Sequence, residues 1–278
     1  MHILVTNDDG IESPGLLALA TSLRALAHVT IIAPDRERSA VGHAVTLHKP
    51  LRAREVSVGL EGVRAFVSNG TPSDCVVLGA LDLMDPRPTL VASGINGGPN
   101  LGDDVLYSGT VAAAMEGAIM GVPSFAISLV RRAPEHEQDA TDDGRRTTDD
   151  GTDYGYAAWF ARELAQTLVA TGMTLPDGVF LNVNVPAVAT DEIRGVRITS
   201  LGRRRWGERL VKRQDPRGET YYWQAGDPFQ DGNPAGTDIA AIMDGYVSIT
   251  PAQLDLTSHE GIRQLESLAE SLSEGRTD

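Results

Sequence analysis

The chain has 278 residues, of which 41% are hydrophobic, so it is long enough to bury a sizeable core as one large α/β domain or a domain with an appendage. Its single cysteine, Cys75, excludes an internal disulfide framework and a four-cysteine zinc site, which fits a reducing cytoplasm. Its net charge of −14 disfavours long DNA or RNA as a partner, because a polyanion needs a basic face to bind.

The amino-terminal segment indicates neither secretion nor membrane insertion. The apolar run HILVT meets the polar run NDDG at once, and no later run approaches the roughly 20 apolar residues that a membrane-spanning helix needs. Lysine-based Schiff-base or P-loop chemistry has few candidates, because the only lysines are Lys49 and Lys212. We therefore expect a cytoplasmic protein, without a membrane partner, that can still bind a small phosphate with the help of a metal.

The first 33 residues have the pattern of a strand, a helix and a second strand. Residues 2–6 and 29–33 are short runs rich in β-branched residues, and leucines and alanines recur between them at helical spacing. Ser13 followed by Pro14 is the N-cap and first-turn pair expected where a helix begins. The acidic turn at residues 7–10 is therefore predicted to follow the carboxyl end of a strand.

The same alternation of strand and helix repeats along the chain. The strand-like runs RAFVS, TLVAS and SFAISL are each followed by a segment with helical signals. This pattern predicts an α/β fold with a Rossmann-like, doubly wound and mostly parallel sheet. Ligands of such sheets bind beyond the carboxyl ends of the strands. We expect the polar loops there to converge on one site, and these loops are NDDG, PDRERSAVGH and SGINGGPNLGDDVLYSGT.

The sequence pattern divides the chain into a core and two C-terminal parts. Residues 1–190 are predicted to form the α/β core, in which residues 131–152 have no apolar periodicity and indicate a flexible, acidic surface loop. Residues 191–236 contain strand-like runs joined across the turn sequence DPRG, which predicts a β-hairpin extension. Residues 237–278 return to a helix and a strand and end in an amphipathic helix and a tail.

The adjacent carboxylates of Asp8 and Asp9 need a compensating charge. Two carboxylates within about 4–6 Å of each other raise the pKa of one of them unless a cation or a shared proton compensates. Gly10 lets the turn bend enough for both side chains to reach one divalent metal ion. For an isolated NDDG run, however, an ordinary Asx-type turn is the commoner explanation.

Two further residues complete an all-oxygen ligand set with this acidic pair. Ser39 follows the second strand, and Asn96 ends a later strand. Such a set suits one hard cation per subunit, Mg²⁺ or Mn²⁺, with water and substrate oxygens completing the coordination. Taken alone, Ser39 is better explained by a helix cap or a loop hydrogen bond, and Asn96 is explained equally well by a turn.

The run YSGTVAAAMEG predicts a helix whose start can bind an anion. Ser108, Gly109 and Thr110 offer backbone N–H groups, two hydroxyls and the positive end of the helix dipole. Simple N-capping by Ser108 or Thr110 is the alternative. The nearby glycines lack the spacing of a dinucleotide-binding loop or a P-loop, so neither a dinucleotide fold nor an ATPase is supported.

Other polar and aromatic residues are expected to lie outside the metal site. His43 and His48 are expected to be hydrogen-bonded or exposed, and Asp103 and Asp104 to lie near a helix start, which attracts carboxylates. The aromatic residues of the hairpin can stack on a base, but on a hairpin they more often bury against another subunit. They are Trp206, Tyr221, Tyr222 and Trp223.

Together these motifs resemble the SurE family of survival-protein 5′/3′-nucleotidases. The matching runs are ILVTNDDGIESPG, APDRERSAVGHAVTL, NGTPSDCV, SGINGGPNLGDDVLYSGTVAAAMEG and GYVSITP. The resemblance implies a Rossmann-like core and a C-terminal hairpin exchanged between the subunits of a homodimer or homotetramer. It also implies four metal ligands and four phosphate-side residues. By position these are Asp8, Asp9, Ser39 and Asn96 for the metal, and Asn100, Ser108, Gly109 and Thr110 for the phosphate.

The activity implied is metal-dependent hydrolysis of nucleoside 5′-monophosphates to nucleoside and phosphate, with 3′-monophosphates and short polyphosphate as further substrates of some family members. Asp8 and Asp9 are the catalytic candidates, with Asp9 orienting or deprotonating the attacking water. A covalent phosphate on one of these aspartates is the mechanistic variant to exclude. The rival functions are a non-catalytic nucleotide or phosphate sensor that uses the same metal site, and a sugar-nucleotide transferase.

Overall fold

The computed structural model describes residues 1–131, 153–170, 175–203, 209–225 and 234–274. Of the surface loop expected at residues 131–152, only Arg131 belongs to these ranges. Trp206, one of the aromatic residues expected on the hairpin, also lies outside them.

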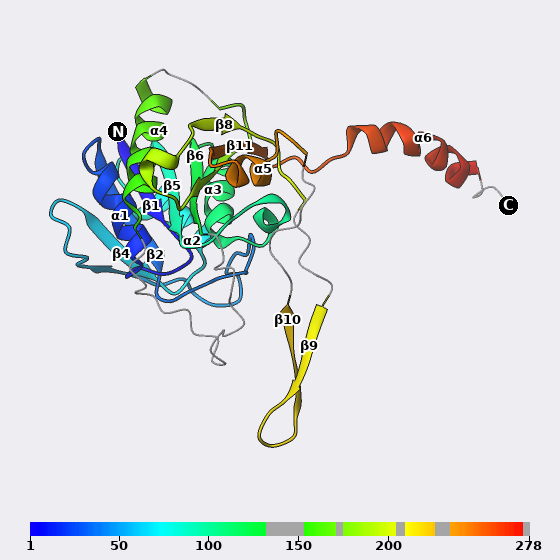
Figure 1. Cartoon of the computed structure of the whole chain (residues 1–278), viewed down its shortest axis with the longest axis horizontal. Helices are drawn as coiled ribbons and strands as arrows, with labels where there is room; N and C mark the ends of the chain where they lie inside the picture. Colours follow the sequence, from blue (N-terminus) through cyan, green and yellow to red (C-terminus); the bar gives the residue numbers. More distant parts are fainter. Residues whose placement is uncertain (132–152, 171–174, 204–208, 226–233, 275–278) are drawn as a thin grey trace.

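A nine-stranded sheet runs through the centre of the described structure (Figure 1) in the order β3-β4-β2-β1-β5-β6-β7-β11-β8. Its neighbouring strands pair in parallel, except that β3 is antiparallel to β4 and β11 is antiparallel to β7. The predicted Rossmann-like α/β fold is confirmed. The strands are β1 (His2–Thr6), β2 (His28–Pro34), β3 (Ala53–Val56), β4 (Arg64–Ser68), β5 (Leu90–Asn96), β6 (Ser124–Val130), β7 (Val179–Pro186), β8 (Val196–Ile198) and β11 (Val247–Gln253).

Helices cover both faces of this sheet. On β1, Ile3 and Val5 belong to one core cluster with residues of α1 (Pro14–Leu23) and α4 (Gly155–Ala170). Leu4, between them, belongs to another cluster with residues of α2 (Pro72–Leu78) and α3 (Gly109–Ile119). Both sets of alternating side chains are therefore buried, which explains why the strands are continuously apolar runs. A π-helical segment, η1 (Gly79–Leu83), continues α2, and a 3₁₀ segment, η2 (Gly102–Leu106), precedes α3.

The C-terminal part of the chain leaves this core and returns to it. Strands β9 (Arg209–Gln214) and β10 (Thr220–Ala225) form a separate antiparallel hairpin, as the sequence pattern indicates, and the hairpin projects from the core (Figure 1). Before the hairpin the chain passes through η3 (Thr190–Glu192), after it the chain returns through α5 (Asp238–Met243), and α6 (His259–Glu274) extends away from the body. In the described ranges, no helix has both the length and the apolar character needed to cross a bilayer.

The start of α1 lies directly against the end of β5. The helix begins at Pro14 with Ser13 as its N-cap residue, as predicted, although the Ser13 side chain makes no capping hydrogen bond and its backbone carbonyl accepts from the N–H of Leu17. A Cβ atom built on Gly15 would lie 2.1 Å from the carbonyl oxygen of Ile95. Glycine at this position therefore lets the helix approach the strand one residue before Asn96.

We predict that Gly15→Ala lowers the free energy of unfolding by about 3 kcal/mol, because the added methyl group meets the backbone of Ile95 and the ring of Tyr154. Thr21→Ala, at an exposed position on the same helix, is the matched control and should change it by less than about 0.5 kcal/mol. Urea unfolding followed by circular dichroism measures both. Equal stability of the parent and Gly15→Ala would contradict the close approach of α1 to β5.

Candidate active site

The three loops expected to converge begin side by side. Strand β1 lies between β2 and β5 and runs parallel to both, so the carboxyl ends of these strands share one edge of the sheet. The residues that follow β1 contact the loop after β2 through the backbone, because the N–H of Ile11 donates to the carbonyl of Pro34 at 3.0 Å. This edge of the sheet is where open α/β folds bind their ligands.

The acidic turn after β1 is closed by Asn7 rather than by either aspartate. The Asn7 side chain donates to the carbonyl of Gly10 at 3.1 Å and accepts from the N–H of Gly10 at 3.2 Å. Gly10 has a φ of 103°, which only glycine adopts readily. The Asx-type turn and the acidic pair are therefore not alternatives, because the turn needs neither carboxylate.

Asp8 is buried against the start of α3. Its side chain is 5% exposed and accepts a short hydrogen bond from the Thr110 hydroxyl, and further bonds from the backbone N–H groups of Gly109 and Thr110. A Cβ atom on Gly109 would lie 2.7 Å from the Cβ of Asp8, so a side chain there would displace the aspartate. The first predicted loop and the predicted helix start are thus in direct contact.

Burial raises the pKa of Asp8, and the hydrogen bonds from α3 only partly offset this effect. Because the folded-state pKa is raised, ionised Asp8 destabilises the fold above that pKa. The cost disappears when the pH falls below 3.8, the ordinary value for this group. When ionised, the Asp8 carboxylate is a buried negative charge that a bound cation would stabilise.

We predict that Thr110→Val lowers the free energy of unfolding at pH 7 by about 1–3 kcal/mol, because a buried charged acceptor loses its hydroxyl donor. The difference in the free energy of unfolding between Thr110→Val and the parent should be smaller near pH 4, where more of the Asp8 carboxyl is protonated. Urea unfolding in a chelating buffer tests this, with Thr21→Val as the exposed control. A loss of stability that is independent of pH would show that Thr110 does not act through the Asp8 charge.

The loop after β2 touches the acidic turn, although its predicted ligand points elsewhere. The backbone N–H of Arg38 donates to the carbonyl of Asp8 at 2.7 Å. The neighbouring Ser39 is exposed, and its hydroxyl donates to Glu37 at 2.5 Å. The backbone thus brings Ser39 to the site, but its hydroxyl must leave Glu37 to bind an ion.

Asn96 ends β5 with its side-chain amide fixed. It is half-buried, and its Nδ2 atom donates to the carbonyl of Gly98 at 2.7 Å, so the amide nitrogen is engaged and the oxygen is the atom suited to a cation. Asn100, predicted on the phosphate side, is buried and mainly anchors the loop. Its Nδ2 donates to Ser128, and its carbonyl accepts from the side chains of Asn182 and Asn184.

Ser108 caps α3, as the alternative interpretation expected. Its hydroxyl oxygen accepts from the N–H of Val111 at 3.1 Å. The N–H groups of Gly109 and Thr110 face the Asp8 carboxylate. The helix start therefore already holds an anionic group, and the positive end of its dipole lies at the acidic turn.

Tyr154 and Arg131 also border the site, and the motifs did not indicate either of them. The Tyr154 hydroxyl lies 3.0 Å from the position of a Cβ on Gly97, and the Arg131 guanidinium donates to the carbonyl of Gly97 at 3.0 Å. Burial and then the charge of Asp9 raise the pKa of the Tyr154 phenol, and Arg131 opposes this shift. Both residues are distant in sequence from the acidic turn, so spacing gives no signal for them.

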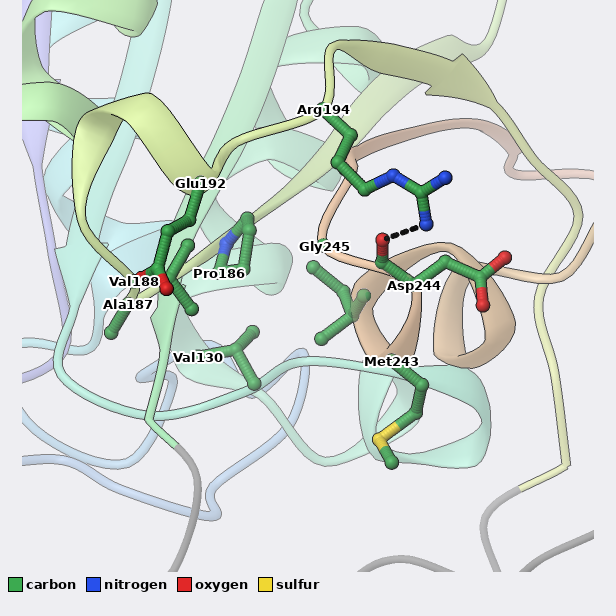
Figure 2. A pocket seen from close by; sticks show the side chains of 10 residues that line it. Val130, Pro186, Ala187, Val188, Glu192, Arg194, Met243, Asp244 and Gly245 are labelled. Carbon is green, nitrogen blue, oxygen red and sulfur yellow. Dashed lines mark hydrogen bonds between the residues drawn. The ribbon is translucent and has the colours of Figure 1, made fainter.

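A separate cavity lies between the segment after β7, η3 and the end of α5 (Figure 2). Across it, Arg194 donates to the backbone carbonyl of Asp244 at 3.3 Å. None of the predicted site residues lines this cavity, so it is not the candidate site. Its lining residues are Val130, Pro186, Ala187, Val188, Glu192, Arg194, Ile242, Met243, Asp244 and Gly245.

The donors at the acidic turn fit a hard cation. Within the described residues, no three His, Cys, Asp or Glu side chains gather closely enough to hold a metal ion. The amide oxygen of Asn96 and the hydroxyl of Ser39 beside the two carboxylates would form an all-oxygen set of the kind that Mg²⁺ and Mn²⁺ favour. A cation bound here would stabilise the ionised form of the buried Asp8 carboxyl.

These features define a Rossmann-like α/β protein whose acidic turn packs against a helix start at the carboxyl edge of the sheet. Residues 3–208 match the family model described as survival protein SurE, so the chain belongs to the SurE family and the resemblance seen in its motifs is confirmed. It is 46% identical to the 5′-nucleotidase SurE of Geobacter sulfurreducens, over 96% of this chain and 93% of that protein. It is 45% identical to the 5′-nucleotidase SurE of Moorella thermoacetica, over 99% of both chains.

Among solved structures, the fold is similar to that of the SurE protein from Aquifex aeolicus. The two chains superpose with a TM-score of 0.79 at 37% sequence identity, and the match covers 97% of this chain and 100% of the other. The similarity therefore extends beyond the core sheet to almost the whole chain.

Proposed function

We propose that the protein is a metal-dependent 5′-nucleotidase that hydrolyses nucleoside 5′-monophosphates to nucleoside and phosphate. The observation that carries this proposal is the contact between the buried Asp8 carboxylate and the start of α3. This contact places a carboxylate suited to a metal ion next to the positive end of a helix dipole, which attracts a phosphate. The names of relatives 45–46% identical over nearly the whole chain support the same activity. Nucleoside 3′-monophosphates and short polyphosphate are the further substrates to compare.

In this proposal Asp8, Asp9, Ser39 and Asn96 hold one Mg²⁺ or Mn²⁺ ion per subunit. Such an ion supplies positive charge to a phosphoryl oxygen and lowers the pKa of water. Asp8 is fixed by its contacts with α3, so it contributes a rigid ligand rather than a mobile base. Asp9 is half-buried and orients or deprotonates the attacking water.

The start of α3 accounts for the phosphate side of the site in the same proposal. The positive end of the helix dipole and the side chain of Ser108 stabilise negative charge on the phosphoryl oxygens, whereas the Thr110 hydroxyl and the N–H groups of Gly109 and Thr110 donate to Asp8 and hold that carboxylate beside the phosphate. Asn100 positions its loop through its contacts with β6 and β7. These donors are attached to rigid elements, so they need little rearrangement during the reaction.

We predict that Asp9→Asn lowers kcat/KM for AMP and GMP by at least about 100-fold, because general-base or water-orienting catalysis typically contributes that much or more. Phosphate release with Mn²⁺ or Mg²⁺ measures the effect. Asp103→Asn, an exposed member of the second acidic pair, is the control and should stay close to the parent. A chelator should abolish phosphate release, and excess metal should restore it.

The rival functions give different results in the same assay. A nucleotide sensor would bind AMP without releasing phosphate above the Asp9→Asn background from any monophosphate. A sugar-nucleotide transferase would transfer its group to an acceptor instead of releasing phosphate from a monophosphate. Labelled phosphate trapped on Asp8 or Asp9 by rapid acid quenching would replace direct water attack with a covalent intermediate.

We also propose that residues 191–236 form an oligomerisation extension and that the hairpin is exchanged in a homodimer or homotetramer. Exposed apolar side chains on the hairpin support this, because Leu210, Tyr222 and Trp223 are each more than half exposed at 62%, 58% and 57%.

We also propose that the protein is located in the cytoplasm. The sole cysteine, Cys75, is buried and free, as suits a reducing compartment.

We predict that the parent protein is a dimer or tetramer by light scattering at micromolar concentration. Replacing Tyr222 and Trp223 together by serine should shift the mass toward the monomer, because the apolar contact area is lost. Lys212→Ser, at the position paired with Tyr222 on the same hairpin, is the control. A parent protein that is monomeric would contradict the exchanged hairpin.

A further inference from the structure

The loop that carries Ser39 crosses from β2 over the starts of α3 and α2. We call residues 38–46 the Ser39 loop. At one end, the N–H of Arg38 binds the carbonyl of Asp8. Farther along, the N–H of Gly42 donates to the carbonyl of Tyr107 at 2.9 Å, and the N–H of Thr46 donates to the Asp74 carboxylate at 3.0 Å. These anchors all use the backbone of the loop.

One side chain of the loop reaches into α3. The Nε2 atom of His43 lies 2.8 Å from the Oε2 atom of Glu116, on the same helix whose start contacts Asp8. The side chain of Glu116 is only 9% exposed, whereas the side chain of His43 is 32% exposed. A buried carboxylate needs a hydrogen-bond partner, so this contact is a fixed point for the loop.

Residues 39–41, between the anchors at Arg38 and Gly42, do not fix their own conformation. Ala40 has a φ of 55°, in the left-handed region that residues other than glycine adopt at a cost. Ser39 is exposed, and its hydroxyl binds Glu37 in the same loop, so its own contacts do not fix it at the acidic turn. The position of Ser39 therefore depends on the anchors on either side of it.

We propose that His43 is a positioning residue whose bond to Glu116 holds the Ser39 loop against α3 and so keeps Ser39 within reach of the cation site. The inference rests on the proposed function for the presence of that site, but not for the chemistry performed there. Loss of the bond frees the loop to relax at Ala40 and withdraw Ser39. Mutation of a residue that orients a metal ligand without touching the metal typically lowers metal affinity by about 10–100-fold.

The test measures Mn²⁺ binding in the absence of substrate, by electron paramagnetic resonance of the free ion. His43→Ala should raise the dissociation constant about tenfold. His43→Gln, which keeps a donor able to reach Glu116, should recover part of the affinity. His48→Ala removes an exposed histidine two residues beyond the Ser39 loop and should bind Mn²⁺ like the parent. The Mn²⁺ concentration that gives half-maximal phosphate release should rise with the dissociation constant.

A double-mutant cycle with Glu116→Gln separates positioning from a general loss of structure. If His43 acts through Glu116, the two changes together should weaken Mn²⁺ binding no more than His43→Ala alone. Unchanged Mn²⁺ affinity in His43→Ala would overturn the proposal, as would additive effects in the cycle. A parent that binds no Mn²⁺ would overturn both this inference and the cation site. Binding of Mn²⁺ by the parent without phosphate release would refute only the nucleotidase proposal and leave the His43 comparison valid.

Discussion

The site depends on one buried charge. Asp8 lies at the end of β1 with its carboxylate pressed against the start of α3, where Thr110 and the backbone N–H groups of that helix donate to it. Burial still raises the pKa of Asp8, so these donors do not fully compensate the charge. The absence of a side chain at Gly109 follows from the same contact, because a Cβ atom there would collide with the aspartate. A cation beside Asp8 would balance this charge.

The sheet order determines what surrounds this charge. With β1 between β2 and β5, the loops after these three strands begin at one edge, and the packing of α1 on the end of β5 fixes the third of them. The parts of the site differ in how firmly they are held. Asn100 is buried and bound by the side chains of Asn182 and Asn184, whereas Ser39 is exposed and depends on the anchors of its loop. We infer that Ser39 is the most adaptable of the candidate site residues.

Local patterns in the sequence were sufficient for the core elements and for the acidic turn. The β-branched run before Asp8 and the Ser13-Pro14 pair predicted β1 and the start of α1, and the predicted hairpin corresponds to β9 and β10. The short edge strand β3 was not predicted, because AREV has no clear apolar alternation. The candidate metal ligands Ser39 and Asn96 rest on the convergence of their loops and on the family resemblance, since neither residue is distinctive alone. Contacts over long separations, such as His43 with Glu116 at 73 residues, give no local signal.

The central claim is that four oxygen-bearing side chains from three loops enclose one hard cation next to the start of α3. Anomalous diffraction from a crystal soaked in Mn²⁺ tests it most directly. The account predicts one strong peak within about 2.6 Å of oxygen atoms of Asp8, Asp9 and Asn96, with the Ser39 hydroxyl turned from Glu37 toward the ion. A peak remote from Asp8, or no peak at a saturating concentration of Mn²⁺, would contradict it.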